Sequence, residues 1–414
     1  MTAPDAAAGL PDRDFRPAGE GRYILELTRH AVTLDLDRLR RDRGYVHGEL
    51  LVRCGLPGRR SSTDTLYAGD VNVSGVPSRD LVAHLARQAN IGSVEWPEVL
   101  GDLYTRVLAA ERQGRPAVRL RDLQRPDPDD AMAVDGLRLL KRHPVILFGD
   151  GGAAKSYLAL YLASRLAASG VRVLYADWEF AGEDHRDRLE RICGEDMPDV
   201  AYVRCERPMV AEADRLRRIV REDRIDYLVC DSVAFAADGP PEAAEVAGAY
   251  FRALRGIGVG SLNIAHTTKA EGGDQKPFGS TFWHNGARST WYAKRAAGEP
   301  GDARLSIALF NRKTNLGPLA PAAGYSIEFG ADRTVFSPAS VAEMGPDVAG
   351  QLPIAARMAA ALRAGSLTIV ELAQELDARP DTVSRIAKRY DGTRFVRVPG
   401  ADGVYRIGLA ARAA

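Results

Sequence analysis

Cysteine is scarce in this sequence and never stands in a spacing that binds metal. The four cysteines lie far apart without a C-x-x-C pair, and the seven histidines show no zinc-ligand spacing. A disulfide framework and a zinc module are therefore excluded, and we expect reduced thiols in a cytoplasmic protein. The cysteines are Cys54, Cys193, Cys205 and Cys230.

Long apolar runs and an excess of one charge are also missing. No apolar run approaches the roughly 18 residues that a membrane span needs, and the start MTAPDAAAGLPDRDF has neither the basic end nor the apolar core of a signal peptide. We expect no membrane partner. Lys and Arg number 56 against 55 Asp and Glu, a formal net charge of +1. Any surface that binds nucleic acid must therefore be local.

Glycine is concentrated where chemistry is expected. The apolar strand Val145–Phe148 runs into GDGGAAKS, and an amphipathic helical pattern follows. Strand, glycine-rich turn, Lys-Ser and helix predict a loop whose backbone N–H groups cradle the phosphates of ATP. Lys155 reaches the β- and γ-phosphates in such a loop, and Ser156 holds Mg²⁺; a purely structural turn is the alternative. The predicted nucleotide-binding residues are Gly149, Asp150, Gly151, Gly152, Ala153, Ala154, Lys155, Ser156 and Tyr157.

One position departs from this motif, because Ala154 stands where glycine is expected before the lysine. An alanine fits where the loop becomes helix if its φ is negative, at a cost of about 1 kcal/mol, and it costs more if φ is positive.

A second acidic group follows further along. Residues 225–232 form an apolar strand ending in Asp231, about one strand–helix–strand crossover after the loop. A carboxylate at this place coordinates Mg²⁺ together with Ser156. The alternation of strands and helices predicts an α/β fold: a mostly parallel sheet between helices, with antiparallel strands at one edge.

Composition divides the chain into five parts. Residues 1–18 are expected to be disordered. Residues 19–122 alternate like a small α+β domain for subunit or partner contacts, and residues 123–133 form a Pro/Asp-rich linker. The phosphate-binding core takes residues 134–345, and residues 353–410 form a separate tail domain.

The tail shows three helical segments followed by a hairpin, the pattern of a winged helix-turn-helix. From Ile354 onward it holds ten Lys and Arg against six acids. We predict that it binds duplex DNA, with protein docking as the alternative. The predicted contacts are Thr382, Ser384, Arg385 and Lys388 on the third helix, and Arg397 and Arg406 on the wing.

Four motifs together resemble the RecA-fold ATPases, especially the RepA-type hexameric replicative helicases of plasmids. They are GDGGAAKS, VLYADWE, YLVCDS, and NIAHTTK followed by FGSTFWHNGARSTW, within residues 134–330. The resemblance implies a RecA-like core that works as a homo-oligomeric ring or filament, with a hexamer as one option. It also implies that Glu179 activates the attacking water and that His266 senses the γ-phosphate. An exposed Glu and a lone His at strand ends are the structural alternatives.

The same resemblance implies a basic residue that acts on the neighbouring subunit's site. Arg288 is the first candidate, although Phe278 replaces the arginine that many relatives carry before Gly-Ser. It further implies that the loop 269–283 touches single-stranded DNA, a plain surface loop being the alternative. The reserve candidates for the basic residue are Lys276, Arg312 and Lys313; the loop contacts are Lys269, Lys276, Phe278, Phe282 and Trp283.

These features predict a Mg²⁺-dependent ATPase that acts on DNA as a helicase or translocase. An ATP-gated DNA-binding regulator or loader without unwinding activity, for plasmid, phage or mobile-element maintenance, is the second hypothesis. A small-molecule kinase is the third.

Overall fold

A computed structural model describes residues 13–19, 21–114, 117–125, 130–267, 276–299, 301–400 and 403–410. The chain divides into two compact units, Met1–Arg125 and Pro126–Ala414. The boundary falls inside the stretch predicted as a linker, but strand β6 already begins at Ala131. Among the described residues, no helix combines the length and apolar composition that crossing a bilayer requires.

The first unit is an antiparallel sheet of five strands in sequence order, packed on two helices. Alternation places Val32, Leu34 and Leu36 on the buried face of β3. The predicted disorder of residues 1–18 is wrong for Asp14–Pro17, which pair with β2; residues 1–12 lie outside the described part. The elements are β1 (Asp14–Pro17), β2 (Tyr23–Leu27), β3 (Val32–Asp42), β4 (Tyr45–Cys54), β5 (Thr65–Asn72), α1 (Arg79–Ala89) and α2 (Trp96–Gln113).

The second unit is built on a nine-stranded sheet of order β10-β9-β11-β12-β8-β13-β14-β15-β16. The first six strands in this order are parallel, and the last three are antiparallel. The sheet strands are β8 (Pro144–Gly149), β9 (Val173–Asp177), β10 (Val200–Arg204), β11 (Tyr227–Asp231), β12 (Gly260–His266), β13 (Ser289–Arg295), β14 (Arg304–Thr314), β15 (Ala323–Phe329) and β16 (Thr334–Pro338); β6 (Ala131–Val134) and β7 (Leu137–Leu140) form a separate pair.

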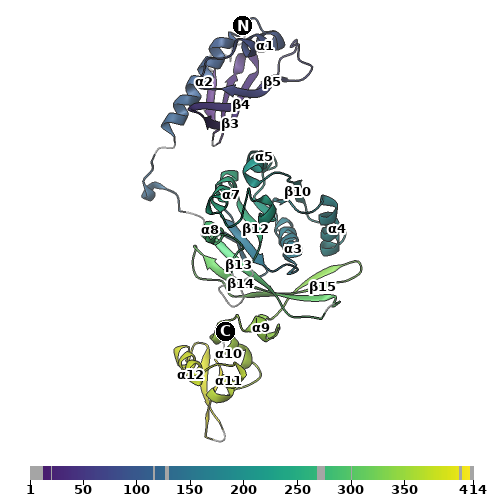
Figure 1. Ribbon diagram of the computed structural model, residues 1–414, viewed down its shortest axis with the longest axis vertical. Helices are drawn as coiled ribbons and strands as arrows, with labels where there is room; N and C mark the ends of the chain where they lie inside the picture. Colours follow the sequence, from purple (N-terminus) through teal and green to yellow (C-terminus); the bar gives the residue numbers. More distant parts are fainter. Residues whose placement is uncertain are drawn as a thin grey trace, which may run out of the picture. The chain divides into compact units, whose positions relative to one another are not determined.

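Helices cover both faces of this sheet (Figure 1). In β8, Val145 and Leu147 enter the core with α3, whereas Ile146 and Phe148 enter the core with α5 and α7. A strand buried on both faces needs such a continuous apolar run. The helices are α3 (Lys155–Ala168), α4 (Gly182–Cys193), α5 (Met209–Glu222), α6 (Val233–Ala236), α7 (Ala244–Ile257), α8 (Thr281–Gly286) and α9 (Pro346–Ala349).

The tail forms a core of its own from three helices and an antiparallel hairpin. Thr368 and Glu371 form a capping box that fixes the start of the second helix. Pro380 opens the third helix, where its missing N–H costs nothing. The elements are α10 (Ile354–Ala361), α11 (Ile369–Glu375), α12 (Pro380–Arg389), β17 (Phe395–Pro399) and β18 (Tyr405–Leu409).

Candidate active site

The glycine-rich loop joins the carboxyl end of β8 to the start of α3. Gly149 is required because a Cβ there would lie 2.2 Å from the carbonyl oxygen of Ala293 on β13. Gly152 has φ = 73°, a left-handed conformation that glycine adopts without a steric cost. The loop therefore curls tightly before α3 begins, so that the free N–H groups of the first helical turn face the loop.

Ala154 occupies the left-handed region as well, with φ = 52° and ψ = 29°. The φ of Ala154 is therefore positive, which is the case for which the sequence predicts the higher cost. Its Cβ adds about 1–2 kcal/mol of strain relative to glycine.

Lys155, the first residue of α3, folds back over the loop. Its Nζ donates to the carbonyl oxygens of Gly149 at 3.0 Å and Asp150 at 2.7 Å. Burial lowers the pKa of Lys155, while the charges of Asp231, Asp150 and Glu179 counteract this effect. The nearby acids favour the charged form of the ammonium group, and that form can pair with a phosphate.

Asp231, the last residue of β11, is fully buried. Tyr175 donates a 2.7 Å hydrogen bond to its Oδ2, but Oδ1 has no hydrogen-bond partner among the described residues. Burial raises the pKa of Asp231, and hydrogen bonding from Tyr175 and Ser156 opposes the shift. A buried, unpartnered carboxylate oxygen beside a hydroxyl fits the oxygen donors that Mg²⁺ prefers. No cluster of three or more His, Cys, Asp or Glu residues stands out as a metal site in the described chain.

Glu179 lies two residues beyond the end of β9, in a turn that leads to α4. It lines a cavity of about 210 Å³ together with the loop, Asp231 and His266. The structure thus brings four sequence-predicted features together: the loop from Gly152 to Tyr157, Glu179, Asp231 and His266.

His266 ends β12 directly beside Gly149 of the phosphate loop. Burial and the nearby charge of Lys155 lower the pKa of His266, which favours a neutral ring near pH 7. Its carbonyl oxygen accepts a 2.8 Å hydrogen bond from the N–H of Phe278. His266 therefore connects the cavity to the segment that carries the predicted DNA loop.

Arg288 lies beside the amino end of β8, whereas the phosphate loop follows the carboxyl end of the same strand. Its N–H donates to the carbonyl oxygen of Pro144, the first residue of β8. Five strand steps separate Pro144 from Gly149, about 17 Å at ~3.3 Å per residue. Arg288 is exposed there, so a role in a neighbouring copy's site stays a prediction.

Two of the three reserve basic residues, Arg312 and Lys313, are already engaged by other groups. Lys313 donates to the carbonyl oxygens of His284, Asn285 and Ala287 at 2.8–3.0 Å. Arg312 stacks over two aromatic rings and bonds to Gln351.

The predicted DNA loop is described only at its end, because residues 268–275, including Lys269, lie outside the described part. Lys276, Phe278 and Phe282 are exposed. Trp283 is not, so its prediction as a stacking face is wrong. It is 1% exposed, packs against Tyr250 and donates from Nε1 to Pro241.

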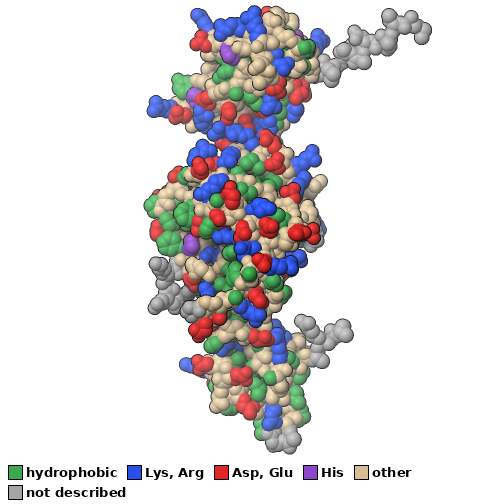
Figure 2. Space-filling view, turned by 90° about the vertical axis from the view of Figure 1, so that its right-hand side faces the viewer, with side chains coloured by type: hydrophobic (Ala, Val, Ile, Leu, Met, Phe, Trp, Pro, Cys, Tyr) green, Lys and Arg blue, Asp and Glu red, His purple; other side chains and the backbone are tan. Residues whose placement is uncertain are grey.

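In the tail, the exposed residues include Ser384, Arg385 and Lys388 on α12 and Arg397 on β17, whereas Thr382 and Arg406 are half-buried. On the face of the molecule in Figure 2, basic and acidic side chains are interspersed. This agrees with the net charge of +1.

Sequence reasoning missed two arginines near the cavity. The guanidinium group of Arg188 lies 4.8 Å from the ring centre of Tyr157 and 4.5 Å from that of Phe180. Arg295 ends β13 next to the loop, with Nη1 4.0 Å from where a Cβ of Gly152 would lie. No sequence motif marks either residue, because strand order and helix packing place them there.

A family model matches the part of the chain that holds the phosphate loop. Residues 109–272 match the family model of an AAA domain. A KaiC-like protein from the hyperthermophilic archaeon Pyrococcus horikoshii is 17% identical; the match covers 48% of this chain and 91% of that one, with a TM-score of 0.38. No match was found among curated proteins.

Proposed function

We propose that this chain is a Mg²⁺-dependent ATP hydrolase that acts on DNA as a RepA-like or RecA-like helicase or translocase. The observation that carries the proposal is the single cavity that gathers the phosphate loop, Lys155, Glu179, Asp231 and His266. The match of residues 109–272 to an AAA domain supports the nucleotide chemistry.

The chain's own residues divide the work of hydrolysis. Backbone N–H groups of the loop and the Lys155 ammonium group hold the β- and γ-phosphates. Ser156 and Asp231 would hold Mg²⁺, which would neutralise charge that develops on the phosphate oxygens. Glu179 orients the water that attacks the γ-phosphate in line and accepts its proton. His266, beside the loop, relays the presence of the γ-phosphate to the segment that begins after it.

The DNA part of the proposal rests on two exposed surfaces. Lys276, Phe278 and Phe282 combine a phosphate contact with faces on which bases stack. The tail, interpreted as a winged helix-turn-helix, presents Arg385 and Lys388 on its third helix. A ring or filament of identical subunits allows Arg288 of one copy to serve the cavity of the next.

The ATPase rate without DNA, with single strands and with duplex tests this function, with particle mass measured with and without ATP. We expect single strands to stimulate hydrolysis, ATP to promote assembly, and a forked duplex to be unwound. Preference for one duplex without unwinding favours an ATP-gated DNA-binding regulator, for which α12 provides the contacts. A rate that no nucleic acid changes favours a small-molecule kinase.

Two pairs of matched variants sharpen the test. Glu179→Gln should lose turnover, whereas Glu190→Gln removes an exposed carboxylate that pairs with Arg186 and should not. Arg385→Gln should weaken duplex binding, whereas Arg363→Gln removes an exposed arginine that pairs with Glu343 and should leave binding unchanged. Equal effects within either pair contradict the assignment.

A further inference from the structure

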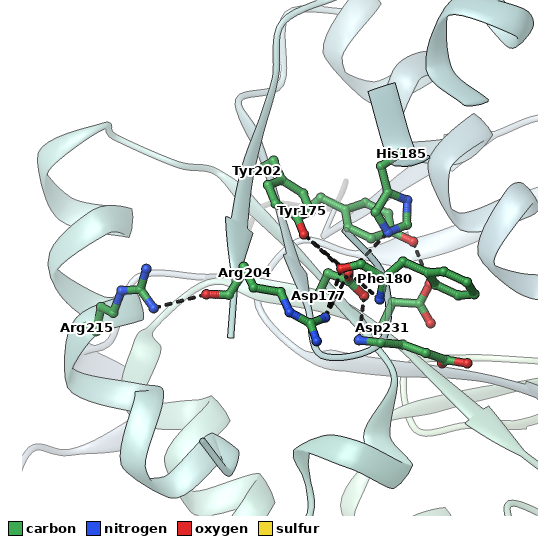
Figure 3. A network of polar contacts seen from close by, with 9 residues as sticks. Tyr175, Asp177, Phe180, His185, Tyr202, Arg204, Arg215 and Asp231 are labelled. Atoms are coloured by element: carbon green, nitrogen blue, oxygen red, sulfur yellow. Dashed lines mark hydrogen bonds and ion pairs between the residues drawn. The ribbon is translucent and has the colours of Figure 1, made fainter. Parts of the chain in front are cut away.

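The carboxylate of Asp177 contacts the turn that follows β9, beside Phe180 (Figure 3). It is fully buried at the carboxyl end of β9. Its Oδ1 accepts the backbone N–H of Glu179 at 3.0 Å, and its Oδ2 accepts that of Phe180 at 2.8 Å. One side chain thus fixes the backbone of both residues that carry the turn away from the strand.

Side chains of β10 hold the same turn from its other side. The hydroxyl of Tyr202 and Nη1 of Arg204 donate to the carbonyl oxygen of Phe180 at 3.1 and 2.9 Å. Each also lies 3.4 Å from Oδ2 of Asp177. Arg204 is itself held, since its carbonyl oxygen accepts from Arg215. The turn is therefore held by the Asp177 carboxylate on one side and by the side chains of Tyr202 and Arg204 on the other.

Neighbouring groups keep the pKa of this acid low in spite of its burial. His185, buried in α4, places Nε2 3.4 Å from Oδ2, and the positively charged guanidinium group of Arg204 lies 3.4 Å from the same oxygen. Burial raises the pKa of Asp177, but His185 and the N–H groups of Glu179 and Phe180 outweigh it, so the pKa is lower than usual. A carboxylate is needed here, because a neutral amide has one acceptor oxygen for two N–H donors.

Backbone hydrogen bonds around Asp177 also connect the end of β9 to its two neighbours, β11 and the segment after β10. The N–H of Trp178 donates to the carbonyl oxygen of Asp231 at 2.7 Å, and the carbonyl oxygen of Asp177 accepts from Cys205 at 2.8 Å. Asp177 itself does not line the cavity that holds Glu179 and the phosphate loop. Any effect it has on the reaction must therefore pass through the residues that it positions, and of these Glu179 and Phe180 line the cavity.

We infer that Asp177 is a positioning residue: it sets the backbone of the Glu179 turn so that the Glu179 carboxylate faces the phosphate loop. This inference rests on the proposed ATPase function. It adds a second acid that touches neither nucleotide nor metal and still controls the rate of hydrolysis.

Asp177→Asn tests this role in the full chain. We expect kcat to fall about 10- to 100-fold, while the KM for ATP changes less than about twofold, because the phosphate loop keeps its contacts. In a Glu179→Gln background the same substitution should have no further effect on the residual rate. A purely structural role would lower the fraction of folded protein and cost the same factor in both backgrounds.

A milder variant keeps the test valid if Asp177→Asn does not fold. Tyr202→Phe removes one hydroxyl from the turn and leaves no charge unpaired, so we expect an about 3- to 10-fold lower kcat with KM unchanged. Tyr161→Phe is the matched control, since its hydroxyl bonds to Asp135 away from the turn, and it should keep the wild-type rate.

The outcomes separate the two claims. A wild-type protein without ATP hydrolysis, or a Glu179→Gln variant that turns over normally, refutes the proposed function. Folded Asp177→Asn and Tyr202→Phe proteins with wild-type kcat overturn the positioning role and leave the ATPase standing, as does an equal loss in both backgrounds.

Discussion

Replacing Ala154 by glycine should stabilise the protein, although glycine gives the unfolded backbone more freedom. Ala154 has φ = 52°, where an L-residue with a Cβ costs about 1–2 kcal/mol more than glycine. About 0.5–1 kcal/mol of this stabilisation is offset, because glycine gives the unfolded backbone greater conformational freedom. The net gain is about 0.5–1 kcal/mol, or a Tm higher by about 1–3 °C for a domain of this size.

The neighbouring alanine provides the control for this prediction. Ala153 is 1% exposed and is not among the residues with positive φ. Ala153→Gly therefore relieves no strain and loses a buried methyl group, so its Tm should fall. Differential scanning calorimetry of both variants without nucleotide, at one pH, measures the two shifts. A Tm that falls equally in both would refute the strain at Ala154 and the conformation of the loop described above.

Four further predictions concern the cavity and the core. Lys155→Ala should lower ATP turnover about 10²- to 10³-fold. Glu179→Gln should lower ATP turnover about 10²- to 10⁴-fold while the variant still binds ATP. Steady-state kinetics and nucleotide-binding measurements test both variants, and rapid turnover by either one contradicts the role of its residue. Asp231→Asn should abolish Mg²⁺-dependent turnover, yet it should raise the Tm of the protein without nucleotide. Burial raises the pKa of Asp231 in the folded protein, so ionisation of this group destabilises the fold as the pH rises above the pKa that the group has in the unfolded chain. The gain should shrink toward pH 4, and a gain independent of pH, measured by thermal scans, argues against this cause. Trp283→Ala should cost about 3–5 kcal/mol of stability in denaturant titrations, and a loss of DNA affinity at full stability would restore its predicted stacking role.

Local sequence predicted those features whose causes are themselves local. The apolar run of β8 and the glycines after it predict a strand and a phosphate loop. The predicted alternation of strands and helices gives parallel strands whose carboxyl ends share one edge of the sheet. The observed strand order, which pairs β9 with β11, then brings Glu179 and Asp231 to one cavity.

Contacts between distant segments could not be predicted in this way. Trp283 follows a glycine-rich stretch that suggests a surface loop, yet packing against α7 buries it. Arg295 reaches the phosphate loop only because β13 lies parallel to β8. The left-handed backbone of Ala154 follows from the loop's closure, which the residue type by itself disfavours.

The strand order has a consequence for how the protein is made. β8 lies between β12 and β13, whose residues follow it by more than a hundred positions. A ribosome must therefore release the chain beyond Arg295 before both edges of β8 are paired. The antiparallel strands of the first unit need only their immediate neighbours and can form while synthesis continues. Nascent chains stopped before β13 should therefore carry a finished first unit and an ATPase core with β8 open at one edge, where chaperones would bind.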